Sequence, residues 1–254
     1  MKGLDARHYL LRVSLRRDQV PSFDEFPFCL PALRGLDTLE LHPAVTFLIG
    51  DNGTGKSTLM EAIAVAWGFN PEGGSTNFSF STRASHSDLH ERLRLARSIR
   101  RPRDGFFLRA ESFFNLATEI ERLDQIDCPE RSVISGFGGK SLHEQSHGES
   151  FLALLTHRLR GGGLYLLDEP EAALSPMRQM AALTRIHDLV GLDSQFLIAT
   201  HSPILMAYPN ATIYQLSENG IRRVQYTDTE YYTVTKAFLN KHEDMLRTLM
   251  EPET

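Results

Sequence analysis

The chain has 254 residues, of which 41% are hydrophobic, and this apolar content is ample for a packed core and rules out wholesale disorder. The 27 Lys and Arg residues against 32 Asp and Glu give a net charge of −5, so bulk charge does not hold the chain on DNA or on a membrane, although a local basic patch still could. The apolar runs are too short for a membrane span, the first residues lack the apolar region of a signal peptide, and the two cysteines fit no disulfide framework or zinc spacing. These features predict a cytoplasmic protein whose residues 1–254 form one domain.

The pattern of apolar residues predicts strands that alternate with helices. Residues 9–17 partly alternate apolar with basic residues, as an edge strand does, whereas the continuous β-rich run 44–49 is typical of a buried parallel strand. In chain order, the predicted elements are strand 9–17, strand 44–49, helix 57–67, strand 77–80, strand 105–110, helix 113–124, helix 151–159, strand 164–167, helix 177–189, strand 195–199, a hairpin of 211–215 and 221–226, and helix 229–250 within a C-terminal segment 229–254. This alternation indicates an α/β fold with a mostly parallel central sheet.

The strongest motif is GDNGTGKS at residues 50–57, which matches the phosphate-binding pattern G-x-x-x-x-G-K-[ST] between a predicted strand and a predicted helix. Its glycines let backbone N–H groups curl around phosphates, and the helix N-terminus adds its positive dipole end. Lys56 is expected to reach the β- and γ-phosphates of ATP, and the Ser57 hydroxyl is expected to bind Mg²⁺. The expected ATP-binding residues of this loop are Gly50, Asn52, Gly53, Thr54, Gly55, Lys56, Ser57 and Thr58.

Two further polar clusters each follow a predicted buried strand. Asp168 and Glu169 come directly after Leu164-Tyr-Leu-Leu, and His201 follows the strand that ends at Ala199. Because nucleotides bind at the carboxyl ends of the strands in open α/β sheets, we expect these side chains to lie beside the phosphate loop. Asp168 can hold Mg²⁺ through water, Glu169 can deprotonate the attacking water, and His201 can contact the γ-phosphate.

The order of the motifs resembles that of the ABC-type ATPases. The phosphate loop is followed by Ser146-His-Gly148-Glu, then by Leu-Leu-Asp168-Glu169-Pro, then by Thr-His201-Ser. The S-x-G-E form is similar to the branch that includes chromosome-structure and recombination ATPases, and the lead-in over residues 39–58 resembles small stand-alone ATPases of bacteria.

This resemblance implies a P-loop fold with an antiparallel β subdomain and a small helical subdomain at about residues 112–145. It also implies an ATP-dependent homodimer in which two chains bind head to tail around two ATP molecules. Ser146 and Gly148 of one chain would then contact the γ-phosphate held by the partner's Lys56.

Three positions depart from the family pattern. Glu111 stands where a Gln is usual, and we assign it to Mg²⁺ through water, because a carboxylate can coordinate the ion in this way. The segment after Pro170 ends in Ser175 rather than Asp, so the contact across the dimer is expected to differ. No Tyr lies where transporter subunits stack adenine; Phe26 and Phe28 are the candidates, although core packing is the commoner role of such residues.

The leading functional prediction is an ATPase that hydrolyses ATP to ADP and phosphate and drives an unidentified partner. One alternative is the ATP-binding subunit of a membrane transporter, but residues 112–145 leave little chain to grip membrane helices. The other is an ATP-dependent nucleic-acid clamp or sensor. It depends on one basic cluster, which could equally be a solvated edge or a protein-partner surface and lacks interleaved aromatic residues. That cluster comprises Arg92, Arg94, Arg97, Arg100, Arg101 and Arg103.

Overall fold

A computed structural model of the chain describes residues 8–75, 87–126, 134–141 and 143–251. Its strands are β1 (Leu10–Leu15), β2 (Thr38–Glu40), β3 (Val45–Ile49), β4 (Leu93–Arg97), β5 (Asp104–Arg109), β6 (Gly163–Asp168), β7 (Gln195–Ala199), β8 (Thr212–Ser217) and β9 (Gly220–Val224). Its α-helices are α1 (Pro31–Arg34), α2 (Lys56–Trp67), α3 (Leu89–Arg92), α4 (Phe113–Ile126), α5 (His147–Ala153), α6 (Pro176–Gly191), α7 (Glu230–Asn240) and α8 (His242–Met250). The strand expected at 77–80 lies outside the described residues.

The centre of the fold is a six-stranded sheet with the order β5-β6-β7-β3-β8-β9. Every neighbouring pair in it is parallel except the terminal hairpin of β8 and β9. The strands β3, β6 and β7 are buried along their whole length, as continuous apolar runs in a parallel sheet covered on both faces should be. The α/β class and the mostly parallel sheet are therefore confirmed.

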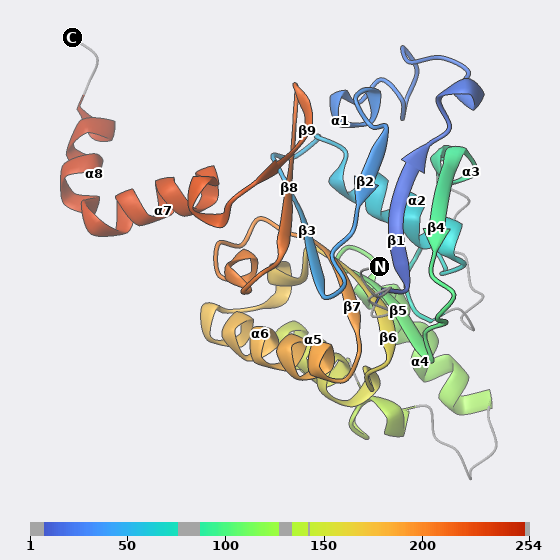
Figure 1. The fold of residues 1–254 in the computed structure, drawn as a ribbon. Coiled ribbons are helices and arrows are strands. Elements are labelled where there is room, and N and C mark those ends of the chain that lie inside the picture. The colour runs from blue at the N-terminus through green and yellow to red at the C-terminus, as the bar shows by residue number, and fades with distance from the viewer. Residues whose placement is uncertain (1–7, 76–86, 127–133, 142, 252–254) are drawn as a thin grey trace.

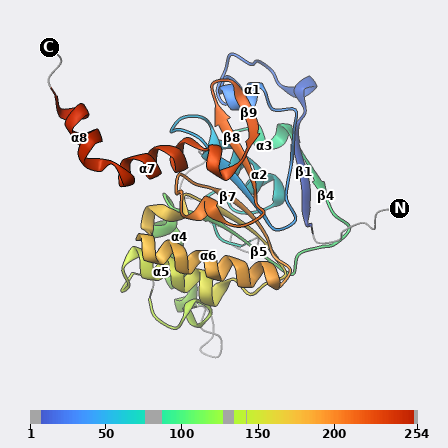
Figure 2. The ribbon, with the colours of Figure 1, turned by 60° about the vertical axis from the view of Figure 1, so that its left-hand side comes forward.

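Alternate side chains of the sheet enter two different cores. Phe47 and Ile49 point into a core shared with α4, α5 and α6, whereas Leu48 points into a second core shared with α2. Figure 2 shows α4, α5 and α6 gathered along one face of the sheet. On the other face, α2 lies between the six-stranded sheet and a smaller antiparallel sheet with the order β2-β1-β4.

The small sheet corrects the expectation for residues 9–17. The strand β1 is not an edge strand but the central one, paired with β2 on one side and with β4 on the other. Residues 93–97, LRLAR, were assigned only to a basic cluster, yet Leu93 and Leu95 pack into the core around α2. The alternation of these two leucines with polar residues makes β4 a strand with one buried face.

Two predicted helices also differ from the structure. The predicted helix 151–159 begins earlier, at His147, and its last turn, Leu154–Arg158, is a π-helix. The predicted helix 229–250 is two helices, because Lys241 between α7 and α8 has φ −139° and ψ 37°, which are not helical values. Both helices extend away from the body of the fold (Figure 1). Among the described ranges, no helix has the length and apolar character needed to cross a membrane.

Candidate active site

The parallel strands bring the predicted motifs to one edge of the six-stranded sheet. Arg109 at the end of β5 is in register with Asp168 at the end of β6, and Asp168 is in register with Ala199 at the end of β7. The phosphate loop follows the neighbouring strand β3 and leads into α2. The loop, the Asp168–Glu169 pair and His201 therefore meet at this edge, as expected from the carboxyl ends of parallel strands.

The loop has the backbone that its glycines allow. Gly50, Gly53 and Gly55 have φ values of 144°, 79° and 97°, which non-glycine residues rarely adopt. At Gly50 a Cβ atom would also lie 2.2 Å from the Leu216 carbonyl oxygen, so this position requires glycine for two reasons.

The Lys56 ammonium lies folded back on the loop. Its Nζ donates to the carbonyl oxygens of Gly50 at 2.7 Å and Asp51 at 2.9 Å. The side chain is buried, and this burial lowers the pKa of Lys56, an effect that the nearby Glu169 and Asp168 carboxylates oppose. A buried ammonium beside an open loop of N–H groups favours an anionic ligand.

Ser57 and Asp168 form the oxygen pair expected at a magnesium site. The Ser57 hydroxyl donates to Asp168 Oδ1 at 3.2 Å, which places the two side chains on the same side of the loop. Burial raises the pKa of Asp168 to about 7, against the opposing effect of the Arg109 guanidinium. The neighbouring Glu169 carboxylate adds to the rise.

Arg109 is a member of the site that the sequence interpretation missed. Its guanidinium pairs with Glu61 at 2.6 Å and Glu111 at 3.1 Å, and its Nε lies 3.8 Å from Asp168 Oδ2. That buried Nε has no hydrogen-bond partner among the described residues. Its position one residue before the end of the predicted strand 105–110 was a usable signal, since strand ends supply this edge.

Glu169 and His201 face one another across the site. Glu169 has a left-handed backbone with φ 52°, which non-glycine residues adopt at a cost and which occurs at active sites among other positions. Its Oε1 lies 3.5 Å from His201 Nε2. This Nε2 is buried and makes no hydrogen bond within the described part of the chain. It can therefore form a hydrogen bond to a bound ligand without breaking an existing one.

Two residues outside the motifs hold His201 in place. The Glu171 carboxylate accepts from the Thr200 hydroxyl at 2.7 Å and from the His201 backbone N–H at 2.5 Å. The Tyr231 hydroxyl on α7 lies 2.9 Å from His201 Nδ1 and 2.8 Å from the Gly50 carbonyl oxygen. Nothing in the sequence near Tyr231 indicated this role, because only the fold brings α7 to the phosphate loop.

Ser146 and Gly148 are not among the residues that line the cavity over the phosphate loop. Ser146 is the N-cap of α5 and forms a capping box with Glu149. Hydrogen bonds from the hydroxyl and then the backbone N–H of Ser146 lower the pKa of Glu149. A Cβ atom on Gly148 would lie 2.6 Å from the Ala173 carbonyl oxygen, so glycine lets α5 pack closely on the segment that follows Glu169.

A cavity of about 370 Å³ lies over the phosphate loop. Phe26 is at its rim with 67% of its surface exposed, whereas Phe28 is 2% exposed in the core. The expectation of core packing is thus met by Phe28 and wrong for Phe26. The lining residues are Phe26, Leu30, Asn52, Gly53, Gly55, Lys56, Ser57, Thr58, Glu111 and Glu169.

Comparisons with known proteins agree with this geometry. Residues 28–118 match a family described as "AAA domain", and residues 107–207 match one described as "AAA domain, putative AbiEii toxin, Type IV TA system". The macrolide export ATP-binding/permease protein MacB of Marinobacter nauticus is 23% identical over 92% of this chain, and the alignment spans 41% of that relative's length. A solved ATP-binding cassette of an ABC transporter has a TM-score of 0.50 and 18% identity, covering 84% of this chain and 89% of that one.

The solved cassette shares the fold of this chain. Together, the two family matches span residues 28–207 of this chain, which include the phosphate loop, the Asp168–Glu169 pair and His201. These matches place the motifs of this chain within segments that resemble AAA domains.

Proposed function

We propose that the protein binds MgATP and hydrolyses it to ADP and phosphate at the interface of a head-to-tail homodimer in the cytoplasm, and that this cycle drives an unidentified partner. The observation that carries the proposal is the meeting of Lys56 and Ser57, Asp168 and Glu169, and His201 at one sheet edge. These two pairs and His201 follow three different strands, β3, β6 and β7, and together they supply the groups that phosphoryl transfer needs.

The loop and Lys56 bind the phosphates. The N–H groups of residues 53–58 surround the β-phosphate, and Lys56 Nζ exchanges the Gly50 and Asp51 carbonyls for β- and γ-phosphate oxygens. This exchange replaces two neutral acceptors with charged ones, so the hydrogen bonds of the ammonium become stronger. Phe26 lines the rim of the cavity and would stack on the adenine ring.

The oxygen atoms of Ser57 and Asp168 would hold Mg²⁺. Among the described residues no group of three or more His, Cys, Asp or Glu side chains could hold a metal ion by itself, so the remaining ligands would be nucleotide phosphate oxygens and water, as Mg²⁺ prefers. When bound, the ion neutralises charge on the β- and γ-phosphate oxygens. Glu111 lines the same cavity and would reach the ion through water, which requires it to leave Arg109.

Glu169 is the proposed general base. Its carboxylate accepts a proton from a water molecule, whose oxygen bonds to the γ-phosphorus as the bond to the β–γ bridging oxygen breaks, giving ADP and phosphate. The Tyr231 hydroxyl has one proton and donates it either to Gly50 or to His201 Nδ1. When it donates to Nδ1, the neutral imidazole carries its proton on Nε2 and can donate to the γ-phosphate.

A second chain completes the site. Ser146 and Gly148 are outside the set of residues that line the phosphate-loop cavity of one chain. The proposal that they contact ATP held by the partner's Lys56 accounts for both this separation and the close packing of α5 behind Glu169.

Glu169→Gln tests the base and the dimer together. The amide cannot take the proton, so we expect ATP binding to persist, turnover to fall by about 10²- to 10⁴-fold, and an ATP-bound dimer to accumulate. Size-exclusion chromatography with light scattering, with and without MgATP, measures the dimer, and phosphate release measures turnover. Glu40→Gln on β2 is the control for loss of an exposed carboxylate outside the site. A monomer with ATP bound, or normal turnover, would refute the proposal.

A further inference from the structure

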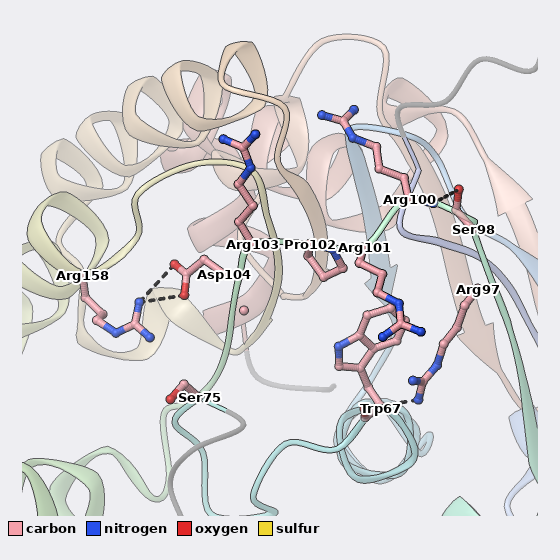
Figure 3. Close-up of a pocket in the computed structure, with 11 residues that line it drawn as sticks. Trp67, Ser75, Arg97, Ser98, Arg100, Arg101, Pro102, Arg103, Asp104 and Arg158 are labelled. Carbon is pink, nitrogen blue, oxygen red and sulfur yellow. Dashed lines mark hydrogen bonds and ion pairs between the residues drawn. The ribbon is translucent and has the colours of Figure 1, made fainter.

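A second cavity lies at the other end of the strands of the six-stranded sheet, beside the amino-terminal ends of β5 and β6. Its volume is about 460 Å³, and Figure 3 shows it between the end of α2, the segment joining β4 to β5, and Arg158. We call it the arginine pocket. Its charged lining residues are Arg97, Arg100, Arg101, Arg103, Arg158 and Asp104.

The pattern of β4 explains why Arg97 reaches α2. Leu93 and Leu95 point inward and pack around α2, and Arg97 follows them on the same face. Its guanidinium lies 4.4 Å from the centre of the Trp67 ring and donates to the carbonyl oxygens of Ala66 and Trp67. These carbonyls end α2, so Arg97 also caps the negative end of the helix dipole.

The other arginines divide into partnered and unpartnered side chains. Arg158 pairs with Asp104 at 2.9 Å, and Arg100 pairs with Asp193 at 2.8 Å. Arg101 and Arg103 are exposed, and among the described residues neither forms an ion pair or a side-chain hydrogen bond. The lining of the pocket therefore holds five guanidiniums and one carboxylate, in a chain whose net charge is −5.

This imbalance points to an anionic ligand that binds without a metal ion. Guanidinium groups present paired N–H donors that match phosphate oxygens, and they hold water less strongly than an ammonium does. All the cationic side chains that line the pocket are arginines, with no lysine among them. Phosphate is one of the two anionic groups, with carboxylate, that this donor geometry fits.

The arrangement of the arginines favours a linear polyanion over a single phosphate. In Figure 3, Arg97 and Arg101 extend toward Trp67, whereas Arg100 and Arg103 extend toward the opposite side of the view. The guanidiniums thus spread across the mouth of the pocket and do not converge on one point. Successive phosphates of a nucleic-acid strand are spaced along a line, so they match such a spread.

We propose that the arginine pocket binds the phosphate backbone of a nucleic-acid strand. The basic cluster contains no aromatic residue in the sequence, but the fold brings the half-buried Trp67 of α2 beside it, with the Arg97 guanidinium over its ring. This binding site is separate from the proposed ATPase site, and its test needs no nucleotide. Failure of either proposal therefore leaves the other intact.

The test is fluorescence anisotropy of a labelled single-stranded oligonucleotide that is longer than one site of about 4 to 16 nucleotides. The full chain is titrated without ATP, with salt between about 50 and about 200 mM. We expect Arg101→Glu/Arg103→Glu to weaken binding at least about tenfold and to lower the slope of log affinity against log salt by about 1 to 2. Both side chains are exposed and unpartnered, so the fold should be retained, and circular dichroism checks this. Arg101→Ala/Arg103→Ala provides a milder second variant.

The matched control is Arg222→Glu/Arg223→Glu, which gives the same change in net charge. Both residues lie on β9, the edge strand of the six-stranded sheet that is farthest from β5. We expect this control to bind the oligonucleotide as the wild type does. The proposal is overturned if the wild-type chain does not bind at low salt, or if the two double variants weaken binding equally. It is also overturned if tripolyphosphate displaces the oligonucleotide at an equal concentration of phosphate groups, because the pocket would then be a small-anion site.

Discussion

The two ends of α2 carry opposite charge arrangements. The helix has 12 residues and is therefore about 18 Å long. At its N-terminal end, Lys56 and Arg109 stand among carboxylates, which are Asp51, Glu61, Glu111, Asp168 and Glu169. At its C-terminal end, five arginines stand with Asp104 in the lining of the arginine pocket.

The two charge arrangements imply that the ends of α2 have different requirements for their ligands. A carboxylate-rich site repels a polyphosphate unless a cation is bound with it. The proposed ATP site at the N-terminal end of α2 therefore requires a metal ion together with the nucleotide. A site with excess guanidinium binds phosphate directly and weakens as salt rises. The two proposed phosphate-binding ends of one helix would thus differ in whether a metal takes part.

Lys56→Ala should weaken ligand binding only at the N-terminal end of α2, where the phosphate loop lies. Loss of charge-assisted hydrogen bonds to the phosphates is expected to weaken ATP binding by about 10- to 100-fold. Oligonucleotide binding to the arginine pocket, measured without ATP, should not change. Isothermal titration with ATP and the anisotropy assay measure the two effects, and Lys236→Ala on α7 is the control for loss of an exposed ammonium. Equal loss at both ends would show that the ends are not separate sites.

Arg109→Met should sharpen the contrast by removing a cation from the carboxylate-rich end. Glu61 and Asp168 are 13% and 4% exposed, and leaving such carboxylates without their partner is expected to lower the free energy of unfolding by about 2 to 3 kcal/mol. Urea unfolding measures the loss. Arg247→Met on α8 is the control, since the two side chains of its pair with Asp244 are 70% and 74% exposed, and it should change stability by less than about 0.5 kcal/mol. An unchanged midpoint for Arg109→Met would mean that the ion pairs contribute nothing.

Tyr231→Phe has the smallest expected effect. The ring stays, but the hydroxyl between His201 and Gly50 is lost, so we expect kcat to fall about 5- to 10-fold, which is about 1 kcal/mol, with KM nearly unchanged. Steady-state phosphate release measures both constants. Tyr232→Phe is the control on the same helix, because the Tyr232 hydroxyl accepts from Lys236 and does not reach the loop. A fall in kcat that is equal in the two variants would rule out a positioning role for Tyr231.

The sequence predicted the parts of the fold that local pattern determines. The buried strands β3, β6 and β7 are continuous apolar runs, and the loop from Gly50 to Ser57 needs its glycines for the backbone that it adopts. The strands β2 and β4 were missed because β2 is three residues long and the arginines of β4 obscured its two inward leucines. Strand pairing across such distances in the chain leaves little local signal.

The same distinction holds for the candidate site. Asp168, Glu169 and His201 were predictable because each follows a recognisable buried strand, whereas Tyr231 reaches the site from α7. Arg97 and Trp67 lie 30 residues apart in the chain, and only the packing of β4 against α2 brings them together. Their role depends on tertiary contacts that no local pattern records.

The link between Tyr231 and Gly50 has a mechanical consequence. It fastens the first turn of α7 to the loop that would hold the phosphates, while α7 and α8 extend outward from the body of the fold (Figure 1). A load applied to these helices therefore acts on the loop, and a shift of the loop displaces the helices. A molecule that binds the projecting helices α7 and α8 would therefore be coupled mechanically to the phosphate loop through the Tyr231–Gly50 hydrogen bond.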